Sequence, residues 1–150
     1  MKAYYLNSCV SIYLIVLLLS SCTGNDNLIT DQGKIESNMV LGIWKIEKFI
    51  DSGKNETSNY TDFIFSFKLD GILISNKDSQ TYTGFWNITK DHSNDDSIDD
   101  LDFNIQFSSP EQLEELSEDW HIISFSSNKI EFIHISGGNG GTDYLTFKKI

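Results

Sequence analysis

The sequence predicts an all-β fold, in which short antiparallel strands form a barrel or a sandwich. Apolar and polar residues alternate one by one over 61–69 and over 101–107, which is the pattern of a strand with one buried face. Six less regular runs of similar length follow the same trend, and turn-forming residues such as Asp70-Gly71 separate the runs. Many short strands divided by turns are typical of these two architectures.

The N-terminus has the layout of a secretory signal peptide that ends at a cysteine. Lys2 precedes an apolar run over 10–19, and small residues stand just before Cys22. A membrane-spanning helix needs about 20 apolar residues, roughly twice this run, so we expect cleavage instead. Residues 19–22, Leu-Ser-Ser-Cys, resemble the bacterial lipobox. This resemblance implies that residues 1–21 are a lipoprotein signal peptide and that Cys22 carries acyl chains such as palmitate.

The part of the chain after the cysteine divides into a tether and one domain. Residues 22–39 contain Asn, Asp, Gly, Ser and Thr with few apolar residues, so we expect a lipidated cysteine followed by a flexible tether. Residues 40–150 are long enough to bury a core of their own. The other cysteine, Cys9, lies in the signal peptide, so the domain has no thiol for a disulfide or a cysteine-based metal site.

Eight strands are expected in this domain, with turns at 70–71, 127–128 and 137–141. On the two regular strands, the residues expected to face the core are Phe63, Phe65, Phe67 and Leu69, and Leu101, Phe103, Ile105 and Phe107. The eight expected strands cover 42–50, 61–69, 71–75, 81–89, 101–107, 120–126, 129–136 and 142–150.

One short helix is expected after the fifth strand. Ser109 is a good N-cap, Pro110 suits the first helical position, and Gln112 completes a capping box. Leu113 and Leu116 are three residues apart, so they would share the buried face of a helix that closes one end of the sheet.

Several motifs follow one another in a set order along the domain. They are Gly42-x-Trp44, a Phe-rich strand before Asp70-Gly71, Gly84-x-Trp86, the pair Leu113 and Leu116, Asp119-Trp120, and a last strand that ends Leu-Thr-Phe-Lys-Lys. Together they resemble the small lipocalin-like lipoproteins of Gram-negative bacterial envelopes over about residues 40–150. The resemblance implies an eight-stranded antiparallel up-and-down barrel, with Trp44 packed across its closed end.

Bulky aromatic side chains are expected to point into this barrel, whose interior is just wide enough for side chains or for one small ligand. They either line a pocket for a small apolar ligand or fill the interior as a core, and the sequence leaves both readings open. The residues concerned are Phe63, Phe65, Phe67, Trp86, Phe103, Phe107 and Trp120.

No pattern of catalytic or metal-binding residues stands out, so we expect no enzyme and no cofactor. His121 and His134 lie on strands that could pair and bring them together, while His92 lies in an acidic segment. Some residues of that segment have the spacing of a calcium loop, but Asp96 stands where the loop needs glycine, so a solvated hairpin loop is the favoured interpretation. The residues at calcium-loop spacing are Asp91, Ser93, Asp95, Asp99 and Asp102.

The formal net charge of −11 excludes a nucleic-acid partner and disfavours docking on anionic lipids through basic residues. We therefore predict an envelope lipoprotein held by the lipid on Cys22, in the outer membrane, whose barrel mouth binds a small apolar ligand. The alternative is an interaction lipoprotein with a filled core, acting through its loops and acidic surface on a protein partner of unknown identity.

Overall fold

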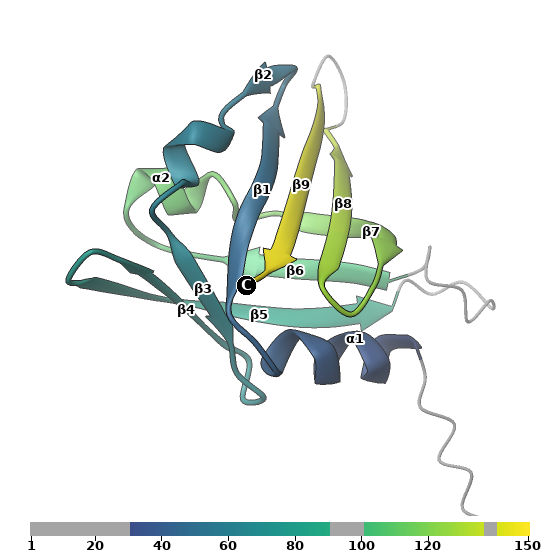
Figure 1. Cartoon of the computed structure of the whole chain (residues 1–150). Helices are drawn as coiled ribbons and strands as arrows, with labels where there is room; N and C mark the ends of the chain where they lie inside the picture. Colours follow the sequence, from purple (N-terminus) through teal and green to yellow (C-terminus); the bar gives the residue numbers. More distant parts are fainter. Residues whose placement is uncertain (1–30, 91–100, 137–140) are drawn as a thin grey trace, which may run out of the picture.

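The structure is a computed structural model that describes residues 31–90, 101–136 and 141–150. Its strands are β1 (Trp44–Asp51), β2 (Lys54–Asn55), β3 (Ile64–Phe67), β4 (Ile72–Lys77), β5 (Gln80–Lys90), β6 (Leu101–Gln106), β7 (Asp119–Phe125), β8 (Lys129–Ile135) and β9 (Thr142–Lys149). All lie in one antiparallel sheet in the order β2-β1-β3-β4-β5-β6-β7-β8-β9, and β1 also pairs with β9. The sheet therefore closes into a barrel of eight strands. The two-residue strand β2 pairs with β1 and does not belong to the barrel wall (Figure 1).

The eight predicted strands are confirmed, and each pairs with its neighbour along the chain. The closing seam runs from Trp44 opposite Lys149 to Ile50 opposite Tyr144, with one irregularity between Ile46 and Lys48. Because β1 pairs with β9, the fold is a closed barrel and not a sandwich. The sequence does not predict β2, which pairs with β1 beyond the barrel wall.

A helix, α1 (Asp31–Val40), replaces the second half of the expected tether and covers the end of the barrel where β1 begins and β9 ends (Figure 1). Ile35 and Met39, four residues apart, are both fully buried. The expectation of a flexible tether is therefore wrong for residues 31–39, while residues 22–30 lie outside the described part. The segment is too polar and too short to be helical alone, so packing on the barrel stabilises the helix.

The expected short helix is present as α2 (Glu111–Glu114), but its cap is different from the prediction. Pro110, not Ser109, occupies the N-cap, and no side chain caps the helix there. The Gln112 side chain donates to the carbonyl of Asn59 instead of closing a capping box. Leu113 and Leu116 are both fully buried, as predicted.

The strand before the first hairpin is shorter than predicted. Strand β3 ends at Phe67, and the N–H of Lys68 donates to the carbonyl of Ile72 at 2.9 Å to close the turn. Gly71 has a φ of +79°, which a residue with a side chain rarely adopts. Leu69 consequently lies in the turn with 84% of its surface exposed, so its expected place in the core is wrong.

The two ends of the barrel are closed differently. Strand β1 pairs with β3 at one position, Trp44 opposite Phe65, and the chain between them forms a 3₁₀ helix, η1 (Thr57–Tyr60). Tyr60 is fully buried, and its hydroxyl donates to the carbonyl of Gln112 at 2.6 Å. This contact joins η1 to α2 at the end opposite α1, which we call the mouth. Within the described residues, no helix has the length and apolar character needed to cross a membrane.

Candidate functional site

The aromatic residues that the sequence places inside the barrel are all buried. Phe67 lies at their centre, with its ring centroid 5.3 Å from that of Trp86, 5.7 Å from Phe103 and 5.5 Å from Phe147. Trp86 stacks on Phe103 at 5.4 Å and an interplanar angle of 25°. These edge-on and stacked contacts are the arrangement of a packed aromatic core. The residues are Phe63, Phe65, Phe67, Trp86, Phe103, Phe107 and Trp120.

Trp44 links this core to α1. It is fully buried, its ring meets Phe67 edge-on at 6.4 Å, and its indole N–H donates to the carbonyl of Met39 at 2.9 Å. The ammonium group of Lys149 lies 4.8 Å from the Trp44 ring centroid and donates to the Asn38 side chain at 2.6 Å. Burial lowers the pKa of Lys149. These contacts fasten α1 to the barrel at the end where β1 begins.

One polar group in the interior has no partner among the described residues. The hydroxyl of Ser75, on β4, is fully buried and makes no hydrogen bond. Its strand neighbours are Phe65 and Tyr82, so its surroundings are largely apolar. Leaving a buried hydroxyl unpaired costs about 1–3 kcal/mol, which makes Ser75 the weak point of an otherwise apolar core.

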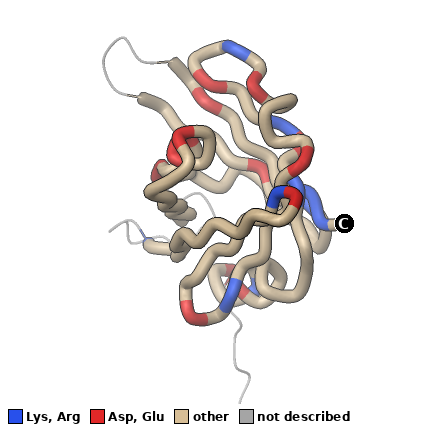
Figure 2. The backbone as a smooth tube through the Cα atoms, turned by 90° about the vertical axis from the view of Figure 1, so that its left-hand side faces the viewer, with Lys and Arg blue, Asp and Glu red and all other residues tan. Residues whose placement is uncertain are grey.

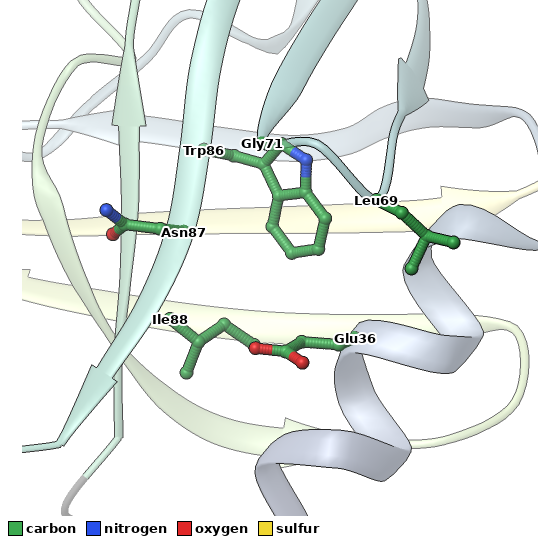
Figure 3. A pocket seen from close by; sticks show the side chains of 6 residues that line it. All are labelled: Glu36, Leu69, Gly71, Trp86, Asn87 and Ile88. Atoms are coloured by element: carbon green, nitrogen blue, oxygen red, sulfur yellow. The ribbon is translucent and has the colours of Figure 1, made fainter.

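A first hollow lies between α1, the turn before β4 and the second half of β5, with a volume of about 160 Å³ (Figure 3). Glu36 and Ile88 point toward each other across it, with the Trp86 ring beside them. The indole N–H of Trp86 already donates to the carbonyl of Lys68 at 2.9 Å, so Trp86 offers the hollow only an apolar ring face. The volume is about half the roughly 300 Å³ at which ligand pockets begin. The lining residues are Glu36, Leu69, Gly71, Trp86, Asn87 and Ile88.

A second hollow, of about 150 Å³, lies at the mouth. Phe49 and Trp120 form its apolar side, with ring centroids 6.4 Å apart. Four carboxylates complete the lining, and none of the Lys, Arg or His residues that the structure describes takes part in it. The hollow therefore has a negative potential that favours a cation. The carboxylates belong to Asp51, Glu115, Glu118 and Asp143.

Tyr60 stands beside this acidic lining. Its hydroxyl oxygen lies 3.1 Å from Oε2 of Glu115. Burial, together with the negative charge of Glu115, raises the pKa of Tyr60 above its ordinary value of 10.0. The phenol consequently stays neutral and keeps its hydrogen bond to α2 over the physiological pH range.

A cluster of Glu118, Asp119 and His134, which we call the rim cluster, lies at the edge of the second hollow. Nε2 of His134 is 3.7 Å from Oε2 of Glu118 and 3.7 Å from Oδ1 of Asp119. One ligand atom from each of the three residues lies within 4.8 Å of the other two. On the other side of the ring, Nδ1 of His134 is 3.4 Å from Oδ2 of Asp143.

The expected approach of His121 to His134 is wrong. His121 stands opposite Ile133 in the β7–β8 pair, so His134, one residue further, points to the other face of the sheet. His121 lies outside the barrel and pairs with Asp102 at 2.7 Å, whereas His134 lies at the mouth. The rim cluster has no signal in the sequence, because its contacts depend on the register between β7 and β8.

Other predicted features lie partly or wholly outside the described residues. These are the signal peptide with Cys22, all but the last residue of the glycine-rich turn at 137–141, and most of the calcium-loop segment. Of the residues at calcium-loop spacing, Asp102 is described and forms its ion pair with His121. Those outside are Asp91, Ser93, Asp95 and Asp99.

The fold defines a small closed antiparallel β-barrel protein, the architecture that the resemblance to lipocalin-like proteins implied. The chain matches no protein-family model and no curated protein. A similar solved structure is that of a DUF4847 family protein from Bacteroides vulgatus ATCC 8482, which is 17% identical. The match covers 76% of this chain and 96% of that chain, with a TM-score of 0.47.

Proposed function

We propose that this chain is a lipid-anchored lipoprotein of the bacterial envelope whose barrel acts through its outer surface and acidic mouth. The observation that carries the second half of the proposal is the packed interior. Phe103 and Phe132 have ring centroids 4.9 Å apart, and Phe65 and Phe147 have centroids 5.2 Å apart, so aromatic rings fill the space where a barrel would hold a ligand. This supports the interaction protein over the carrier of an apolar molecule.

The anchor is supported by the signal sequence and by where the folded part begins. Helix α1 starts at Asp31, nine residues after Cys22 (31 − 22). Nine extended residues reach at most about 30 Å. A lipid on Cys22 would therefore keep the α1 end of the barrel close to the membrane surface and leave the mouth facing away from it.

The surface of the α1 end suits this orientation. Leu41 is 77% exposed and Leu69 is 84% exposed, and Ile150 is exposed beside Ile43, to whose carbonyl its N–H donates at 2.9 Å. Large apolar side chains gathered at one end are suited to contact with lipid.

Basic residues lie near the same end, beside the C-terminus (Figure 2). The strand register places Lys148 opposite both Lys45 and Lys129, and Lys149 follows it. Lys148 also pairs with Glu47 at 2.7 Å and Lys129 with Glu131 at 3.0 Å, so these lysines offset part of the acidity at this end.

Replacing the cysteine tests the anchor. Cys22→Ala should abolish the acyl mass and release the protein from the envelope membrane fraction, as followed by fractionation and mass spectrometry. Cys9→Ala, which changes the other cysteine, should leave processing and membrane attachment as they are. Processed, membrane-bound Cys22→Ala protein would contradict the proposal.

A small apolar ligand is the second candidate, because the unpaired hydroxyl of Ser75 and the Trp86 hollow each offer a contact. Native mass spectrometry of the protein, purified gently from an envelope extract, separates the two candidates. A bare mass is expected for the packed barrel. A reproducible added mass that is lost on denaturation would establish a carrier instead.

A further inference from the structure

The rim cluster combines the ligand atoms that first-row transition metals prefer. We propose that Glu118, Asp119 and His134 bind one divalent transition-metal ion, such as Zn²⁺, at the mouth of the barrel. Zinc is bound in proteins by imidazole nitrogen and by carboxylate oxygen, and three protein ligands leave a position for water. The proposal concerns the folded barrel alone and does not depend on the lipid anchor.

The distances are close to those that a bound ion needs. Zinc–nitrogen and zinc–oxygen bonds of about 2.0–2.2 Å place neighbouring ligand atoms of a tetrahedral site about 3.4 Å apart. Nε2 of His134 is 3.7 Å from both carboxylate oxygens of the rim cluster. Side-chain rotations of Glu118 and Asp119, which are both exposed, would bring the three atoms to the required separation.

A fourth residue holds the histidine in the orientation that metal binding requires. Asp143 is only 8% exposed, and its Oδ1 accepts a hydrogen bond of 2.7 Å from the backbone N–H of Ser52 on the far side of the closing seam. Its Oδ2 lies 3.4 Å from Nδ1 of His134. A proton on Nδ1 then leaves the lone pair of Nε2 directed at Glu118 and Asp119. Histidine ligands are commonly fixed by such a carboxylate behind them.

The charge around the rim cluster also favours a cation. The adjacent hollow is lined by Asp51, Glu115, Glu118 and Asp143, with no Lys or Arg among the described residues of the lining. Like charges brought together in a partly enclosed space repel one another, and a divalent ion offsets this repulsion. Glu118 belongs to both the lining and the rim cluster, so the ion would sit at the edge of the hollow.

The barrel supplies a matched control in His121. It also pairs with an aspartate, Asp102, at 2.7 Å, and it lies on the same strand pair as His134. Within the described residues, the rim cluster is the one group of three or more potential ligands close enough to share an ion, and His121 does not belong to it. A histidine–aspartate pair alone should bind zinc weakly.

The test is a zinc titration of the full chain, purified in detergent without a histidine tag, by isothermal calorimetry near neutral pH. We expect a saturable site for one ion per chain. His134→Gln and Glu118→Gln should each weaken binding at least 10-fold, whereas His121→Gln should change it less than 2-fold. Asp143→Asn, which keeps an oxygen for the Ser52 N–H, should weaken binding about 10- to 100-fold.

Cobalt gives a second readout, because the visible absorption of bound Co²⁺ reports its ligands. The spectrum of the full chain should lose intensity in His134→Gln and keep it in His121→Gln. Circular dichroism checks that each variant is folded. If His134→Gln is unfolded, the effect of Glu118→Gln on metal binding decides the test. Absence of saturable zinc binding, or binding that His134→Gln and Glu118→Gln leave unchanged, would overturn the proposal.

Discussion

The α1 end and the mouth are the two ends of the same eight-stranded barrel, yet their polar groups have different surroundings. At the α1 end, the indole of Trp44 and the ammonium group of Lys149 both find hydrogen-bond acceptors on α1. At the mouth, Asp51, Glu118 and Asp143 line a hollow in which carboxylates predominate, and His134 at its edge is close to two of them. The strands are shared by both ends, so the difference comes from the segments that connect them. One end is closed by a packed helix, and the other gathers carboxylates around a hollow.

The largest expected effect tests whether the α1 end is a true core. Trp44→Ala removes a fully buried ring, so it should lower the free energy of unfolding by about 3–5 kcal/mol. Urea denaturation followed by circular dichroism measures this change. Phe85→Ala, at an aromatic residue of β5 that is mostly exposed, is the control and should cost less than about 1 kcal/mol. If both substitutions lowered the free energy of unfolding by the same amount, Trp44 would not be a core residue.

A smaller effect tests whether α1 belongs to the folded barrel. Met39→Ala should cost about 2–4 kcal/mol in the free energy of unfolding, because Met39 is fully buried between the helix and the barrel. The same substitution in a flexible tether would leave the free energy of unfolding almost unchanged. Ser37→Ala, at an exposed position of the same helix, serves as the comparison in the same denaturation experiment. If the denaturation curves of the two variants were the same, this segment would be a flexible tether and not part of the folded barrel.

A third prediction uses pH to probe the mouth. Tyr60→Phe removes the hydrogen bond to Gln112, so it should lower the free energy of unfolding by about 0.5–1.5 kcal/mol at neutral pH. The pKa of Tyr60 is raised in the fold, so its stabilising contribution is complete below pH 10.0 and is lost as the pH rises above that value.

The difference between the original protein and Tyr60→Phe should therefore narrow in denaturation series above pH 10.0. The remaining tyrosines are common to both proteins and cancel in this difference. A gap of constant size across the alkaline range would contradict the buried, neutral phenol.

The smallest expected effect concerns the interior between the two ends. Ser75→Ala removes a buried hydroxyl without a partner, so the protein should be unchanged or more stable by up to about 1 kcal/mol. Ser66→Ala, on the neighbouring strand at the paired position of Ile74, is the matched control. Thermal unfolding of both variants gives the answer. A clear loss of stability in Ser75→Ala would mean that the hydroxyl has a partner in the barrel.

The strands could be predicted because their signal is local. In β6, Leu101, Phe103 and Ile105 alternate with polar residues, and the same three side chains are buried in the barrel. Leu69 continued the alternation of its strand, but the turn that Gly71 requires begins before it and exposes it. A pattern of alternation therefore identifies a strand better than it identifies its last residue.

Helix α1 and the rim cluster could not be predicted because their causes are not local. The helix carries only Ile35 and Met39 as fully buried anchors in an otherwise polar segment, and the barrel end that they cover exists only after folding. The rim cluster depends on which residue of β8 faces which residue of β7. A shift of one position in that register would turn His134 to the outer face.

The closing seam has a consequence for the order in which the barrel can be completed. Trp44 pairs with Lys149, 105 positions later (149 − 44), so one edge of β1 stays without its partner until β9 has been made. Unpaired strand edges invite pairing with other chains, and charged side chains along an edge discourage it. Lys45, Glu47 and Lys48 on β1 would protect the nascent protein from aggregation during this interval. Contacts between such distant parts of a sequence also slow folding, so the pairing of β1 with β9 limits the rate at which the barrel closes.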